Sequence, residues 1–129
     1  MRNKRDTTKI VLQKMIGYCD NIDELMQKYN SSFELYVKDI SFQYSCNMCV
    51  LQIGELTTRL SDDFKAQHPE IPWRLIKAMR NIHAHEYESV DFEGMWDTLT
   101  QDIPVLRKKL EKLLIDRKLN DNNYLIGEQ

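Results

Sequence analysis

At 129 residues, 42% of them hydrophobic and 29% charged, the chain can bury one core without disulfides or a structural metal, and its composition excludes an intrinsically disordered protein. Its apolar runs are too short for a membrane-spanning helix. The net charge of −2 excludes a protein whose whole surface binds nucleic acid, so such binding would have to use a local patch.

These properties predict one domain at residues 1–119, followed by a polar, flexible tail at residues 120–129. The basic N-terminus is not followed by a signal-peptide core, and the three cysteines form an odd set unlike a secreted disulfide framework. We therefore expect a cytoplasmic protein that does not associate with a membrane.

The first half of the chain predicts two long helices, because its apolar residues recur every three or four positions. The first helix spans residues 8–29, with Val11, Met15, Tyr18, Ile22, Leu25 and Tyr29 on one face. The second runs from about residue 33 to about residue 65, with Phe42, Cys46, Cys49, Ile53, Leu56, Leu60 and Phe64 on one face. Gly54 is unfavourable inside a helix and can mark close approach to another helix.

The second half predicts a third helix from Pro72 to residue 86 or 87, since proline suits the first turn of a helix. A fourth helical region spans residues 92–118, and Pro104 predicts a kink or a fresh start inside it. Its apolar face consists of Met95, Leu99, Ile103, Leu106, Leu110 and Leu113. No segment has a strand pattern, so we expect an all-α antiparallel bundle of four to five helices.

The spacing Cys46-x2-Cys49 also occurs in metal and redox sites. Both cysteines lie on the apolar face of the second predicted helix, and no further cysteine or histidine completes a ligand set. We interpret them as buried small hydrophobic residues, and we predict neither a metal site nor a cofactor.

The third predicted helix carries an unusual set of polar residues. On an ideal helix its core face consists of Leu75, Ile76, Met79 and Ile82. His85 and Asn81 fall on the opposite side, whereas Arg80 and Tyr87 lie at the boundary. His83 falls at the edge of the core face, where a partly buried ring with one hydrogen bond is expected.

Histidine is matched to proton transfer near neutral pH, and arginine binds a phosphate with a fixed charge. His85 and Arg80 therefore supply half of the acid, base and cation set that metal-free RNA cleavage needs. A two-fold axis beside the third helix would supply the other half, so we predict a homodimer whose motifs face each other. Arg74 and Lys77 are candidates for RNA contact, although such a strip is often only a solvated helix face.

The order Arg80-Asn81-x3-His85-x-Tyr87 resembles the Arg-x4-His-x-Tyr signature of HepT proteins in the HEPN superfamily. The resemblance covers residues 35–114 and includes Ile53-Gly54-Glu55, Ile71-Pro72-Trp73, Met95-Trp96 and Asp102-Ile103-Pro104-x-Leu106. It implies a dimeric, metal-independent ribonuclease toxin paired with a nucleotidyltransferase antitoxin of the MNT type. It also implies that Arg80 and His85 carry the cleavage, that Asn81 supports them, and that Tyr87 accepts AMP from the antitoxin.

Two other functions remain open from the sequence. A non-catalytic HEPN interaction module would help a partner nucleotidyltransferase to bind its nucleotide or substrate, and it would keep its function if His85 became alanine. A dimeric helical scaffold would use the motif only for hydrogen bonds at the interface, and Arg80→Ala would then split or unfold the dimer.

Overall fold

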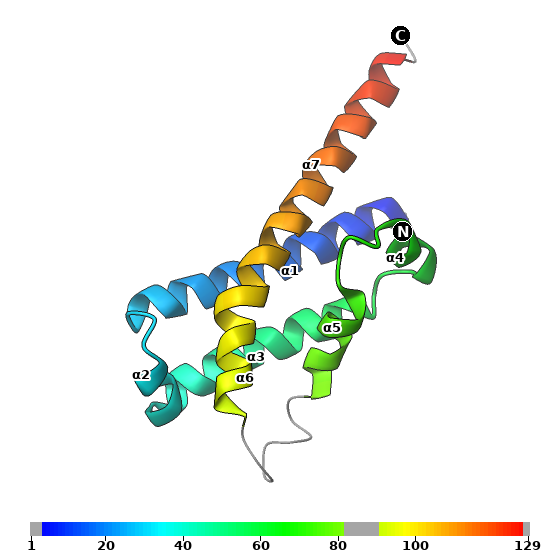
Figure 1. The fold of residues 1–129 in the computed structure, drawn as a ribbon. Coiled ribbons are helices and arrows are strands. Elements are labelled where there is room, and N and C mark those ends of the chain that lie inside the picture. The colour runs from blue at the N-terminus through cyan, green and yellow to red at the C-terminus, as the bar shows by residue number, and fades with distance from the viewer. Residues whose placement is uncertain (1–3, 82–90, 128–129) are drawn as a thin grey trace.

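A computed structural model of the chain describes the backbone of residues 4–81 and 91–127, and the side-chain surroundings of residues 7–81 and 91–118. Its helices are α1 (Lys4–Lys28), α2 (Phe33–Lys38), α3 (Ile40–Thr57), α4 (Asp62–Gln67), α5 (Trp73–Ala78), α6 (Phe92–Asp97), the π turn η2 (Thr98–Asp102) and α7 (Ile103–Gly127). The described residues contain no strand, so the predicted all-α class is confirmed (Figure 1). None of the helices within these ranges has the length and apolar character needed to cross a membrane.

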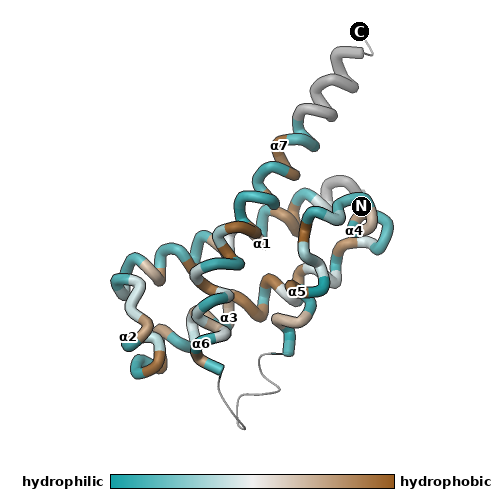
Figure 2. The backbone as a smooth tube through the Cα atoms, viewed as in Figure 1, coloured by the Kyte–Doolittle hydropathy of each residue, from teal (hydrophilic) through white to brown (hydrophobic). Residues whose placement is uncertain are grey.

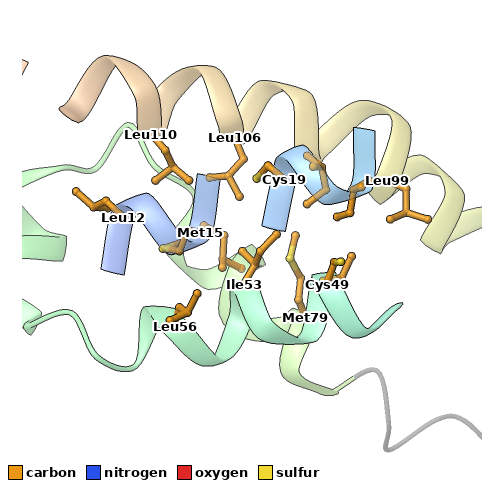
Figure 3. Close-up of a cluster of buried hydrophobic side chains, with 14 of the residues drawn as sticks. Leu12, Met15, Cys19, Cys49, Ile53, Leu56, Met79, Leu99, Leu106 and Leu110 are labelled. Atoms are coloured by element: carbon orange, nitrogen blue, oxygen red, sulfur yellow. The ribbon is translucent and has the colours of Figure 1, made fainter. Parts of the chain in front are cut away.

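The core is organised around α1, which contacts both α3 and α7. Helices α1 and α3 run antiparallel, and α2 joins them at one end (Figure 1). Figure 3 shows Leu106 and Leu110 of α7 above α1, and Ile53 and Leu56 of α3 below it. Helix α3 is hydrophobic along much of its length (Figure 2), which fits an element that contacts α1, α2 and α5.

The prediction of one helix over residues 33–65 was wrong, because the helix is interrupted twice, at Asp39 between α2 and α3 and over residues 58–61 between α3 and α4. Asp39 has an extended backbone between α2 and α3, and its carboxylate accepts a hydrogen bond from the Phe42 amide at 2.9 Å. Ser61 caps α4 in the same way, accepting from the Phe64 amide at 3.1 Å. The apolar spacing continues through both breaks, so periodicity alone does not reveal them.

The predicted interruption at Pro104 is confirmed, since the π turn η2 ends at Asp102 and α7 begins at Ile103, one residue before the proline. Proline has no amide hydrogen, and its ring displaces the carbonyl four residues earlier, which a wider turn accommodates. Helix α7 then continues to Gly127, beyond the predicted end near residue 118. The domain boundary at residue 119 and the flexibility of residues 120–129 remain predictions.

Candidate functional site

The start of α5 is fixed to the end of α4 by Trp73. Its indole Nε1–H donates to the carbonyls of Lys65, at 3.0 Å, and His68, at 2.9 Å. The rings of Trp73 and His68 both pack against Phe64, with centroids 6.2 and 4.6 Å away respectively. Because Pro72 precedes this anchor, α5 begins at a defined place and in a defined direction.

Helix α5 packs on α3 through a narrow face. Ile76 and Met79 are buried as predicted, and Met79 belongs to the same core cluster as Cys49 (Figure 3). Leu75 was predicted to lie in the core, but it is 42% exposed. It lies about 100° around the helix from Ile76, and a two-turn helix with one main neighbour does not cover so wide an arc. The α-helix also ends earlier than predicted, at Ala78, and continues as a 3₁₀ turn over residues 79–81.

Arg80 leaves this turn next to α3. Its Nε–H donates to Oε1 of Glu55 at 2.8 Å, and the two side chains are 38% and 46% exposed. Gly54 lies beneath it, because a Cβ atom there would come within 2.9 Å of the Arg80 Cγ and 3.0 Å of the Ile76 carbonyl oxygen. The close approach predicted for Gly54 is therefore confirmed. Glu55 was missed as a site residue, although it follows Gly54 in a segment that resembles the HepT family.

The predicted basic strip is present on the surface. Arg74, Lys77, Arg80 and Asn81 are all exposed. Within the described part of the chain, Arg74 and Lys77 have no ion-pair partner, so their charges can act on a ligand. This strip carries three cations beside one carboxylate, Glu55, which gives a local positive excess on a chain of net charge −2.

The remaining motif residues, His85 and Tyr87, lie in residues 82–90, outside the described part of the chain. The same holds for His83 and for Ile82, which was predicted to lie on the core face. Arg80 and Asn81 directly precede that segment, so the structure gives the position of the first two motif residues only. The proton-transfer role of His85, the modification of Tyr87 and the packing of His83 stay predictions.

Cys46 and Cys49 are buried small hydrophobic residues, as predicted, and Cys19 is buried too. Cys19, Cys46 and Cys49 all lie in the core. Burial raises the pKa of the Cys19 and Cys46 thiols to about 12, and it raises the pKa of Cys49 too. All three are therefore protonated at neutral pH, a form that is a poor nucleophile and a poor metal ligand. In residues 4–81 and 91–127, no three His, Cys, Asp or Glu side chains gather as a candidate metal site.

A cavity of about 380 Å³ lies away from this strip, between α1 and the start of α7. It is bordered by Arg107, which donates to Asp20 at 2.6 Å and to Glu111 at 2.7 Å. Because two carboxylates already bind this guanidinium, the cavity presents no unpaired arginine to an anionic ligand. We interpret the Arg107–Asp20 bond as a tie between α7 and α1.

Comparisons with known proteins identify the family. The family model described as Ribonuclease HepT-like matches residues 15–113. A Methanocaldococcus jannaschii protein provisionally named an RNase is 30% identical over 95% of this chain and 98% of its own length. A Thermococcus cleftensis protein provisionally named ribonuclease HepT is 38% identical over 70% of this chain and 84% of its own length. No solved structure matches the chain. Since the family model spans most of its length, the chain belongs to the HepT-like ribonuclease family.

Proposed function

We propose that this protein is a metal-independent endoribonuclease, the toxin of a toxin–antitoxin system, which cleaves RNA with Arg80 and His85 at a dimer-interface cleft. The observation that carries the proposal is the exposed Arg80, held by Glu55 at the end of a basic strip in a chain of the HepT-like ribonuclease family. An exposed arginine beside unpaired cations suits the binding of a phosphodiester.

The proposed reaction is an internal transfer at the RNA phosphate. A base removes the 2′-hydroxyl proton, the 2′-oxygen attacks phosphorus, and the bond from phosphorus to the 5′-oxygen breaks as an acid protonates that oxygen. The products are a 2′,3′-cyclic phosphate, which water can open to a 3′-phosphate, and a 5′-hydroxyl. His85 acts as acid or base, and Arg80 stabilises the negative charge that builds up on the phosphate oxygens. Asn81 supports this pair, whereas Arg74 and Lys77 bind neighbouring phosphates.

One motif holds a single proton-transfer histidine, so the proposal needs a second copy of the chain. An exposed apolar stripe on α3 supports dimerisation. Its residues share one face at spacings of three or four, and they are Ile40, Tyr44 and Met48, which are 64%, 56% and 48% exposed, and the half-buried Leu51. Four residues further along that face is Glu55, the partner of Arg80. A second chain on this stripe, which we call the α3 stripe, would bring the two Arg80 motifs together.

Tyr87 is the proposed point of control. A cognate MNT-type nucleotidyltransferase would transfer AMP from ATP to the tyrosine oxygen, releasing pyrophosphate and the phenol proton. The new phosphodiester would carry a negative charge close to Arg80 in the sequence and would compete with RNA for that cation. Co-expression with the transferase should add an adenylate mass to the peptide that holds Tyr87, with loss of RNA cleavage. An unmodified peptide, or full cleavage by the modified protein, would contradict this control.

The cleavage proposal is tested with labelled RNA in excess EDTA. We expect the wild type to cleave, His85→Ala to be slower by roughly 10²–10⁴-fold, and Arg80→Ala to lose a similar factor. Lys77→Ala should weaken RNA binding, whereas Lys109→Ala, an exposed lysine on α7, is the matched control. Loss of cleavage in EDTA would contradict the proposal. So would cleavage that persists at the wild-type rate in both His85→Ala and Arg80→Ala. Protein that folds, dimerises and never cleaves RNA would favour the interaction module instead.

A further inference from the structure

We infer that Glu55 is a positioning residue for Arg80 in the proposed reaction, because its carboxylate accepts a hydrogen bond from the guanidinium Nε–H at 2.8 Å and so restrains the direction of that side chain. This inference rests on the proposed function. The contact joins residues 25 positions apart in sequence, so it links α3 to the turn after α5 that carries Arg80.

The structure restrains Arg80 at both its backbone and its side chain. The preceding residue, Met79, is 6% exposed and packs in the core, which fixes the backbone from one side. Gly54 fixes the distance to α3, since a Cβ atom there would lie 3.1 Å from the Arg80 amide nitrogen. The remaining freedom lies in the long side chain, and the bond to Glu55 removes much of it before any substrate binds.

The bond uses one of the five N–H donors of a guanidinium, so pairing with Glu55 does not by itself exhaust its capacity for a phosphate. The carboxylate does offset part of the arginine's charge. Arg74 and Lys77, which have no ion-pair partner within the described residues, keep the strip net positive. Glu55 therefore orients one cation, Arg80, while its neighbours keep the surface positive. Such an arrangement gains more from the correct position of the guanidinium than from the strength of its attraction to a phosphate.

Two other roles for Glu55 make different predictions. If the pair only ties α3 to α5, its loss should lower stability, yet ion pairs as exposed as this one contribute little to stability. If Glu55 instead restrains Arg80 from reaching RNA, its removal should raise activity. A positioning role predicts lower activity with little change in stability, because small displacements of a catalytic group cost far more in rate than in folding.

The experiment compares Glu55→Ala and Glu55→Gln with the wild type, by kcat and KM on labelled RNA and by thermal unfolding. We expect Glu55→Ala to lose roughly tenfold to hundredfold in kcat with little change in KM, since Arg80 acts on the transition state. Glu55→Gln keeps an acceptor oxygen for Nε–H and should lose only a few-fold. The matched control is Glu111→Ala, which removes a carboxylate 51% exposed from an ion pair on α7 and should leave kcat unchanged.

A second readout does not depend on cleavage. In a proton–nitrogen NMR spectrum, the Arg80 Nε–H signal, assigned by its absence in Arg80→Ala, should exchange slowly in the wild type and faster in Glu55→Ala. An unchanged signal overturns the inference, as does an unchanged or raised kcat in Glu55→Ala. A fall in kcat that only follows a fall in Tm would show a structural tie and overturn it too. A wild type that cleaves no RNA overturns the proposed function itself, and the catalytic role of Glu55 with it.

Discussion

Gly54 and Glu55 are neighbours in the sequence and act on Arg80 in opposite ways. Gly54 acts by having no side chain, so that α5 can approach α3, whereas Glu55 acts by having a charged one. The sequence indicated the first role, because a glycine inside a helix needs a packing reason. It did not indicate the second, since an exposed glutamate on a helix has no distinctive spacing and its partner lies 25 residues away.

Gly54→Ala should destabilise the fold and displace Arg80. The new Cβ would come within 3.1 Å of two backbone atoms, the Ile76 oxygen and the Arg80 nitrogen, which cannot move as a side chain can. We expect a loss of about 1–3 kcal/mol in the free energy of unfolding, partly offset by the better helix propensity of alanine. Urea unfolding measures this, and the RNA cleavage rate should fall as well.

Gly17→Ala is the control, because it makes the same change in α1 where a Cβ atom would meet nothing within 4 Å. There alanine should stabilise the protein by about 0.5–1 kcal/mol. Equal changes in stability at the two glycines would show that helix propensity, rather than contact with α5, determines both changes. The close approach of α5 to Gly54 would then not account for the presence of glycine there.

At the scale of the elements, the spacing of apolar residues predicted where the helices and the core residues lie better than it predicted where the helices end. Asp39 and Ser61 begin α3 and α4 with one side-chain capping hydrogen bond each, a small energy that leaves the hydrophobic spacing intact. Pro104 was the exception, because a missing amide hydrogen is visible in the sequence. The early end of α5 at Ala78 had no comparable signal.

Asp39→Ala should weaken the junction between α2 and α3. The substitution removes the carboxylate that accepts from the Phe42 amide, while the backbone N–H of residue 39 can still donate to the Leu35 carbonyl. We expect a cost of about 1 kcal/mol in urea unfolding, as for other lost helix caps. Asp39→Asn keeps a capping oxygen and should stay close to the wild type. If both variants lose the same stability, charge rather than capping explains the effect.

At the scale of the whole molecule, the fold class and family followed from the sequence, but the second apolar face of α3 did not. Its inner face packs under α1, and periodicity predicted that face correctly. The spacing of the α3 stripe is equally typical of a helix, and only the fold shows that Ile40, Tyr44 and Met48 stay largely exposed within one chain. The sequence predicted a dimer with its two-fold axis beside the third helix, from the chemistry of the motif, and it did not indicate the α3 stripe.

A charge placed on the α3 stripe should disrupt the dimer. We expect the wild type to be a dimer at micromolar concentration, and Tyr44→Asp to raise its Kd by roughly two to four orders of magnitude, because a buried unpaired carboxylate costs about 3–5 kcal/mol. Sedimentation velocity measures the association. The monomeric variant should keep the wild-type circular dichroism and melting curve, since Tyr44 is 56% exposed within one chain, yet it should lose RNA cleavage.

Ile115→Asp is the matched control for this change, because Ile115 is 52% exposed and lies on α7 rather than on the α3 stripe. It should leave both dimer and cleavage intact. A wild type that is monomeric at micromolar concentration would refute the dimer itself. If Tyr44→Asp still forms the wild-type dimer, the second chain must bind elsewhere. If it is monomeric and fully active, one Arg80 and one His85 suffice for cleavage, and the two-fold site is unnecessary.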